Sequence, residues 1–193
     1  MQIIEIVAAT IGILYLWLEM RASMWLWPVG TVLPFFYIYI SWQSQVYGNV
    51  LVNIYYVIAS VLGWIAWHRR RGKEETGEPQ ITRIPRRELA IALLATALLV
   101  SGLTLLYKSV MGSPFPLFDA VATSVSFVGM WLLAKAYVEV WYCWFISNVI
   151  YSVLYFVQGF DITGALFIVY TAISVMGAVR WYRLEAKQHE AKA

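Results

Sequence analysis

Two indole rings and an amide recur at helical spacing in the segment 138–157. Trp141, Trp144 and Asn148 are separated by three and then four residues, so a helix places them on one face. Aromatic faces stack on flat rings and attract cations, and an amide both donates and accepts hydrogen bonds. This pattern favours the binding of a flat, polar solute that contains a ring.

A second stripe of the same kind lies in the segment 49–67 and comprises Asn53, Tyr56, Ser60, Gly63 and Trp67. Tyr151 continues the first stripe, and Ser126 lies on a similar polar face in the segment 117–134. An amide deep in an apolar run must find hydrogen-bond partners in protein or in a wet cavity. Ligand binding and bridging between helices therefore both remain open for Asn53 and Asn148, whereas small residues such as Ser60 and Gly63 are expected to pack.

Catalytic and metal chemistry find little support in the residue types. Cys143 is the only cysteine, and neither it nor Ser147 has a histidine nearby, because His68 and His189 fall in polar segments. A nucleophile and base, or a metal site, would need such groups together. We expect no enzyme activity, no catalytic or metal-ligating residues and no cofactor.

Groups for coupling transport to an energy source are also sparse. The acidic residues nearest the apolar runs all fall at the ends of those runs: Glu19, Asp119, Glu139 and Asp161. A membrane proton relay needs buried titratable groups, and the chain has no G-x-x-x-x-G-K-[ST] phosphate-binding loop. Facilitated diffusion is therefore favoured over proton-driven or ATP-driven pumping.

The composition places all of these residues in a membrane. Of the 193 residues, 61% are hydrophobic, 17% aromatic and only 13% charged, with a mean hydropathy of +0.67; soluble domains carry roughly 25% charged residues. This excludes a soluble globular fold and a disordered chain. Apolar runs of membrane-spanning length predict seven helices, at 3–19, 24–42, 49–67, 88–107, 117–134, 138–157 and 162–182.

Basic residues predict the orientation of the spans. Of the 14 Lys and Arg residues, Lys108 alone falls on the opposite side from the rest. The positive-inside rule then puts the N-terminus outside, with the basic loop 68–87 and the tail 183–193 in the cytoplasm. The loop also carries Glu74, Glu75 and Glu78, so we expect no nucleic-acid partner. Trp residues near the cytoplasmic span ends, Trp64, Trp67 and Trp181, are interpreted as an interfacial belt.

An internal repeat predicts the architecture. An offset of 114 residues matches Tyr56, Ser60, Gly63 and Trp67 with Tyr170, Ser174, Gly177 and Trp181, and an offset of 117 matches Gly12 with Gly129 and Trp27 with Trp144. The repeat predicts an all-α integral membrane protein of two parallel three-helix repeats, residues 1–67 and 117–182, joined by the transmembrane linker 88–107. SWEET-type transporters share this arrangement, with the solute site between the repeats.

The motif W-x-x-W-x-x-x-N at Trp141–Asn148, together with the 3+1+3 layout and the segment from Leu51 to Trp67, resembles the PnuC family of bacterial vitamin transporters over nearly the whole chain. The resemblance implies uptake of a B-vitamin form by a facilitator in the bacterial inner membrane, with Trp141, Trp144 and Asn148 in the binding motif and Thr171 as a further substrate contact. One departure concerns Asn53, where carriers of nicotinamide riboside usually have Gln; with the following Ile54-Tyr55-Tyr56, it resembles the thiamine-associated branch.

We therefore expect a facilitator for thiamine or nicotinamide riboside, which are both cationic aromatic solutes. The expected substrate site comprises Trp141, Trp144, Asn148, Asn53, Thr171, Tyr56, Tyr151 and Ser126. A SWEET-like carrier of sugars or nucleosides, and a membrane subunit that interacts with a partner but transports nothing, are the alternatives. Assembly into a homo-oligomer is left open by the sequence.

Overall fold

The computed structural model describes residues 2–43, 47–71 and 79–190, and every extended regular element in these ranges is an α-helix. The helices are α1 (Gln2–Met20), α2 (Leu26–Gln43), α3 (Tyr47–Arg71), α4 (Arg86–Ser109), α5 (Pro116–Ala134), α6 (Val140–Val157) and α7 (Asp161–Glu190). The predicted all-α class with seven helices is confirmed. Residues 72–78 of the predicted basic loop and residues 191–193 of the predicted tail lie outside the described ranges.

The last helix is longer than the apolar pattern predicts. The sequence predicts an end at residue 182, but α7 continues to Glu190. Residues 183–190 contain no Gly or Pro and are rich in Arg, Leu, Glu, Ala, Lys and Gln, which all favour a helix. The end of the apolar run marks the expected edge of the membrane. A helix of polar, helix-favouring residues can continue beyond that edge.

Four helices in the described part of the chain are long and apolar enough to cross a membrane: α4, α5, α6 and residues Thr163–Glu190 of α7. Of these four, α4 is the least buried and α5 the most buried. Leu93, Leu94 and Leu98 of α4 are more than half exposed. Because lipid solvates such side chains, exposure of this kind is expected of a membrane helix.

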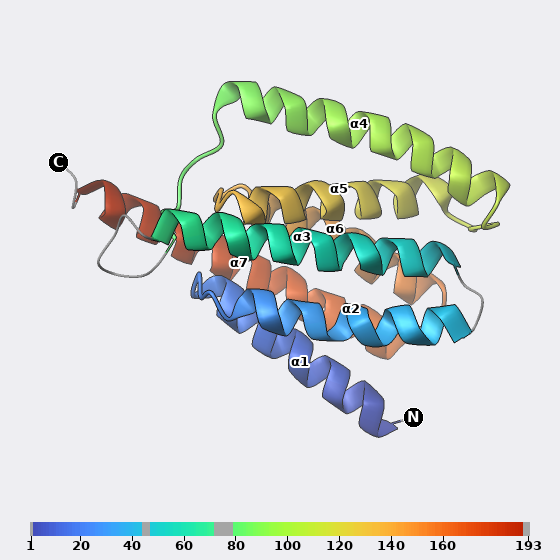
Figure 1. Ribbon diagram of the computed structural model, residues 1–193. Coiled ribbons are helices and arrows are strands. Elements are labelled where there is room, and N and C mark those ends of the chain that lie inside the picture. The colour runs from blue at the N-terminus through green and yellow to red at the C-terminus, as the bar shows by residue number, and fades with distance from the viewer. Residues whose placement is uncertain (1, 44–46, 72–78, 191–193) are drawn as a thin grey trace. The chain divides into compact units, whose positions relative to one another are not determined.

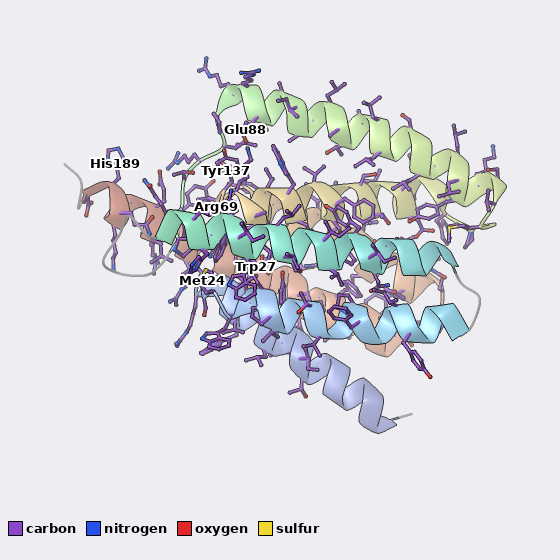
Figure 2. All side chains as sticks on the ribbon, in the orientation of Figure 1. Met24, Trp27, Arg69, Glu88, Tyr137 and His189 are labelled. Atoms are coloured by element: carbon purple, nitrogen blue, oxygen red, sulfur yellow. The ribbon has the colours of Figure 1, made fainter. Side chains whose placement is uncertain are left out.

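The first of two compact units comprises Met1–Gln80 with Ala134–Ala136 and holds α1, α2 and α3. Helix α2 packs along α3, and α1 packs against α2 (Figure 1). Trp27, at the start of α2, is 1% exposed and packs against the C-terminal part of α3 (Figure 2). Its ring lies edge-on to Trp67, with centroids 5.3 Å apart, and covers Gly63 so closely that an added methyl group there would overlap it.

The second unit comprises Ile81–Leu133 and Tyr137–Ala193 and holds α4 to α7. Here α6 packs along α7. Trp141 of α6 lies edge-on to Trp181 of α7, with centroids 5.7 Å apart, and its ring covers Gly177. The contact therefore repeats the one that Trp27 makes in the first unit.

The turns that enter α2 and α6 are repeated as well. Ala22 and Ala136 are buried non-glycine residues with positive φ values of 50° and 54°. The backbone N–H after each donates to the carbonyl five residues back, from Ser23 to Leu18 at 2.9 Å and from Tyr137 to Leu132 at 3.1 Å. This is the Schellman pattern of helix ends, and it places the α1–α2 and α5–α6 turns at the same offset of 114 residues.

Two interpretations of the sequence change as a result. Trp27 corresponds structurally to Trp141, so the offset of 114 extends through α2 and α6, and the offset of 117 that pairs it with Trp144 is not followed. Trp67 and Trp181 are both fully buried, so their interpretation as interfacial belt residues is wrong. Trp64, at 49% exposure, remains suited to an interface.

Within the second unit, main-chain groups of the segment that leads into α4 form hydrogen bonds to side chains and to the backbone near α6. The N–H of Ile81 donates to Gln188 Oε1 at 2.9 Å, and the N–H of Ile84 donates to Glu139 Oε2 at 3.0 Å. Thr82 accepts from the N–H of Val138 at 3.1 Å, beside Tyr137 (Figure 2). The extension of α7 beyond residue 182 thus has a structural role, because it supplies Gln188.

Candidate solute-binding site

The α6–α7 contact positions most of the candidate side chains. From one end to the other, Trp141 covers Gly177, Asn148 Nδ2 donates to Ser174 Oγ at 3.2 Å, and Ser152 Oγ donates to the Gly164 carbonyl at 3.0 Å. The spacing of seven and four residues keeps these α6 side chains on one face. Small residues on α7 let the two backbones approach closely, as is typical of helix contacts in membranes.

The two motif indoles have different surroundings. Trp141 is 1% exposed, with its ring enclosed by Gly177 and Trp181. Trp144 is half-buried, and the edge of its ring lies over Gly129 of α5, 3.2 Å from where a β-carbon would stand. Of these two residues, only Trp144 is therefore partly accessible in this structure.

Asn148, near the middle of α6, is also half-buried. Its hydrogen bond to Ser174 shows that interhelical bridging does occur at this amide. The amide nevertheless has more donor and acceptor positions than the one that this bond uses. Bridging and ligand binding are therefore compatible at Asn148.

Tyr151 belongs to a hydroxyl network that joins three helices. Thr123 Oγ1 of α5 lies 3.0 Å from the Tyr107 hydroxyl of α4 and 3.2 Å from the Tyr151 hydroxyl of α6. The Tyr151 ring also contacts Tyr155 and Phe167, with centroid distances of 6.5 and 5.3 Å. Tyr151 is thus held both at its hydroxyl and at its ring.

The hydroxyls of Ser126 and Thr171 are bonded within their own helices. Ser126 Oγ donates to the Ala122 carbonyl at 2.9 Å, and Thr171 Oγ1 donates to the Phe167 carbonyl at 2.8 Å. Each hydroxyl proton is therefore used, while the oxygen keeps lone pairs for a further donor. Ser126 is buried, and Thr171 is half-buried.

The remaining two candidates belong to the first unit. Asn53 of α3 is 7% exposed, and Tyr56 is half-buried, with its ring 5.7 Å from that of Tyr55. The other six candidates lie on α5, α6 and α7 of the second unit. Within that unit the structure brings Asn148, Tyr151 and Thr171 onto the packed α6–α7 region.

Ser174 and Tyr107 take part in hydrogen bonds around the candidate site that the sequence pattern does not predict. The sequence pattern assigns Ser174 to packing and gives Tyr107 no role in the site. In the structure, however, Ser174 bonds Asn148, and Tyr107 bonds Thr123, which in turn bonds Tyr151. The spacing of each residue along the sequence predicts the helix face on which it lies. The identity of the partner, however, depends on the register between neighbouring helices, which one sequence does not specify.

Three acidic residues of the second unit lie at helix ends, as expected. Asp119 and Asp161 lie in the first turns of α5 and α7, and Glu139 precedes α6. Asp119 accepts a hydrogen bond from Ser113. Glu19, in the last turn of α1, is fully buried. The described residues include no group of three His, Cys, Asp or Glu side chains that could hold a metal ion.

Comparison with known proteins agrees with this architecture. The family model described as nicotinamide mononucleotide transporter matches residues 2–183. A solved structure titled as the crystal structure of the vitamin B3 transporter PnuC superposes with a TM-score of 0.74 at 24% identity, covering 94% of this chain and 81% of that chain.

Curated relatives cover most of the sequence. The riboflavin/roseoflavin transporter RibM of Streptomyces davaonensis is 24% identical over 181 residues, 92% of this chain and 84% of its own. The nicotinamide riboside transporter PnuC of Neisseria mucosa is 27% identical over 192 residues, 95% of this chain and 73% of its own. PnuC of Escherichia coli is 26% identical over 166 residues, 74% of this chain and 69% of its own. With the family model matched across nearly the whole chain, this multi-pass membrane protein belongs to the nicotinamide mononucleotide transporter (PnuC) family.

Proposed function

We propose that this protein takes up a small B-vitamin form, thiamine or nicotinamide riboside, by facilitated diffusion. Family membership supports transport, and the relatives named for nicotinamide riboside and for riboflavin support a vitamin that contains a flat ring. The observation that carries the proposal is the half-buried pair Trp144 and Asn148, held on one α6 face beside α7. A fully enclosed pair would favour the alternative of a subunit that transports nothing.

In this proposal, Trp144 stacks on the solute ring, and Asn148 with Thr171 forms hydrogen bonds to its polar groups. Trp144 is partly accessible, and Thr171 keeps its oxygen lone pairs. Stacking and cation–π attraction both suit a cationic ring. Trp141 contributes indirectly, because its enclosed ring fixes the α6–α7 contact that holds the other residues.

The choice between the two vitamins rests on the first unit. Asn53, Tyr56 and the departure from Gln at position 53 favour a thiamine-type pocket, whereas the relatives named PnuC favour nicotinamide riboside. Asn53 is buried and Tyr56 half-buried, and in this proposal both residues influence which vitamin is bound. Tyr151 and Ser126 are the corresponding weaker candidates in the second unit. Asn53→Gln is expected to shift the preference toward nicotinamide riboside.

Facilitated diffusion is supported by the position of Asp119, Glu139 and Asp161, which lie at helix ends. Proteoliposomes preloaded with unlabelled vitamin test this mechanism. Labelled vitamin should enter by counterflow without an imposed gradient of protons or sodium. Uptake that requires a pH gradient and is lost in Glu19→Gln would instead identify coupling through the buried carboxylate.

We further propose that the protein resides in the bacterial inner membrane with its N-terminus outside and its C-terminus in the cytoplasm. The distribution of Lys and Arg supports this orientation. In a Cys143→Ser background, an impermeant maleimide applied to intact cells should label Ser113→Cys and spare Lys187→Cys. Labelling of Lys187→Cys alone would reverse the orientation.

A further inference from the structure

The orientation of one site amide is determined by a neighbouring hydroxyl. Ser174 Oγ donates its single proton to the Tyr170 carbonyl at 2.8 Å. The same oxygen lies 3.2 Å from Asn148 Nδ2 and can only accept in that contact. The Asn148 amide therefore directs its nitrogen toward Ser174. Reversing the amide would require the hydroxyl to leave the Tyr170 carbonyl and donate to Oδ1 instead.

This orientation turns Asn148 Oδ1 away from Ser174. In the described part of the chain, Oδ1 accepts no hydrogen bond, while Ser174 is buried at 2% exposure and is thus shielded from solvent competition. Thr171 has the same polarity, because its proton is donated to the Phe167 carbonyl and its oxygen remains an acceptor. Asn148 on α6 and Thr171 on α7 therefore both offer acceptors.

We propose that Ser174 is a positioning residue that fixes Asn148 as a hydrogen-bond acceptor toward the solute. The site would then select a ring that carries an exocyclic –NH₂ group. This inference rests on the proposed function. Both candidate vitamins carry such a group, thiamine on its pyrimidine and nicotinamide riboside in its carboxamide. An analogue with an oxygen in place of the –NH₂ group would bring a second acceptor to Asn148 Oδ1, with no proton to form a hydrogen bond. A site built around one hydrogen-bond polarity rejects the mismatched analogue because its own buried group is then left unpaired.

The repeat supplies a matched control for Ser174. Ser60 occupies the equivalent position on α3, 114 residues earlier, and is also buried, at 3% exposure. Position 34 of α2, equivalent to Asn148, is a buried proline and has no amide side chain to orient. Loss of a buried serine hydroxyl can therefore be compared at two similar positions, only one of which bonds a site amide.

The test is isothermal titration of purified protein with each vitamin and with its oxygen analogue, oxythiamine for thiamine and nicotinic acid riboside for nicotinamide riboside. The wild type should bind the –NH₂ form at least about tenfold more tightly. Ser174→Ala should reduce that ratio several-fold, because the amide can then rotate. Ser60→Ala should keep the wild-type ratio.

The outcomes separate this inference from the proposed function. Equal binding of the –NH₂ and oxygen forms by the wild type overturns the inference and leaves vitamin transport standing, whatever the fate of the variants. An unchanged ratio in folded Ser174→Ala overturns the positioning role. If the wild type binds none of the four compounds, the proposed substrates fail and the inference fails with them. If Ser174→Ala does not fold, Asn148→Ala provides the second measurement. The preference for the –NH₂ form over the oxygen form should be lost in that variant, and an unchanged preference overturns the inference.

Discussion

Trp27 and Trp141, 114 residues apart, have the same environment in two different units. Each is 1% exposed, each lies edge-on to a second tryptophan from the last helix of its three-helix repeat, and each covers a glycine one turn before that tryptophan. The repeat is therefore preserved most clearly in packing. By contrast, Trp144 and Asn148 correspond to Gly30 and Pro34, so the two halves differ where the solute contacts are proposed.

Adding a methyl group to the covered glycines should destabilise the protein. In Gly63→Ala and Gly177→Ala the new carbon would overlap the ring of Trp27 or Trp141, and overpacking of this kind costs about 1–3 kcal/mol. Thermal unfolding in detergent should show a lower Tm for both variants. Gly102→Ala is the control, because no atom lies within 4 Å of its added carbon; an equal loss of Tm there would contradict the account.

Substitution of the two motif tryptophans should have different effects, on stability for Trp141 and on vitamin affinity for Trp144. Trp141→Phe and Trp27→Phe should both lower the Tm, because each loses an enclosed indole. Vitamin affinity in Trp141→Phe should remain within about threefold of the wild type. Trp144→Ala should weaken binding about tenfold or more through lost stacking. A loss of affinity in Trp141→Phe as large as that in Trp144→Ala would assign both rings to the solute.

Thr123→Val should lower stability by about 1–3 kcal/mol, since valine keeps the shape but leaves the hydroxyls of Tyr107 and Tyr151 without this partner. Thr96→Val is the control, because Thr96 bonds only the Ala92 carbonyl of its own helix in the described contacts. Chemical denaturation of both variants measures the difference. Additive effects of Thr123→Val and Tyr107→Phe would argue against a network.

Gln188→Ala should loosen the segment before α4. Its side chain accepts the N–H of Ile81, which is 2% exposed, so amide hydrogen exchange over residues 81–84 should accelerate about tenfold. Arg83→Ala should have much less effect, because the Arg83–Glu185 ion pair, at 3.5 Å, involves an arginine side chain that is 64% exposed. A similar acceleration in both variants would contradict this account, because the exposed ion pair would then matter as much as the Gln188 hydrogen bond.

Much of the architecture follows directly from the sequence. Apolar runs of membrane length predict seven helices within a few residues of their observed ends, and the identities Ser60–Ser174 and Gly63–Gly177 predict the repeat of the last helices. These signals are local or rest on residue identity. The end of α7 departs from the prediction because hydropathy reports the membrane boundary and not the helix end.

The partners of individual side chains could not be predicted in the same way. Tyr15 lies against Gly30 in the first unit, whereas Trp144 lies against Gly129 in the second. Position 15 is equivalent to 129, and position 30 to 144, but the aromatic residue and the glycine have changed places. A comparison of residue identities therefore misses this contact. Likewise, Trp141 and Trp144 are the same residue type three positions apart, and only the register of α6 on α7 shows which ring is enclosed.

The most direct test of the proposed function is isothermal titration of the detergent-purified protein with thiamine and with nicotinamide riboside, alongside Trp144→Ala and Asn148→Ala. The account predicts saturable binding of at least one of the two vitamins by the wild type, weakened about tenfold or more in each variant. Absence of binding for both vitamins, or unchanged affinity in both folded variants, would contradict it.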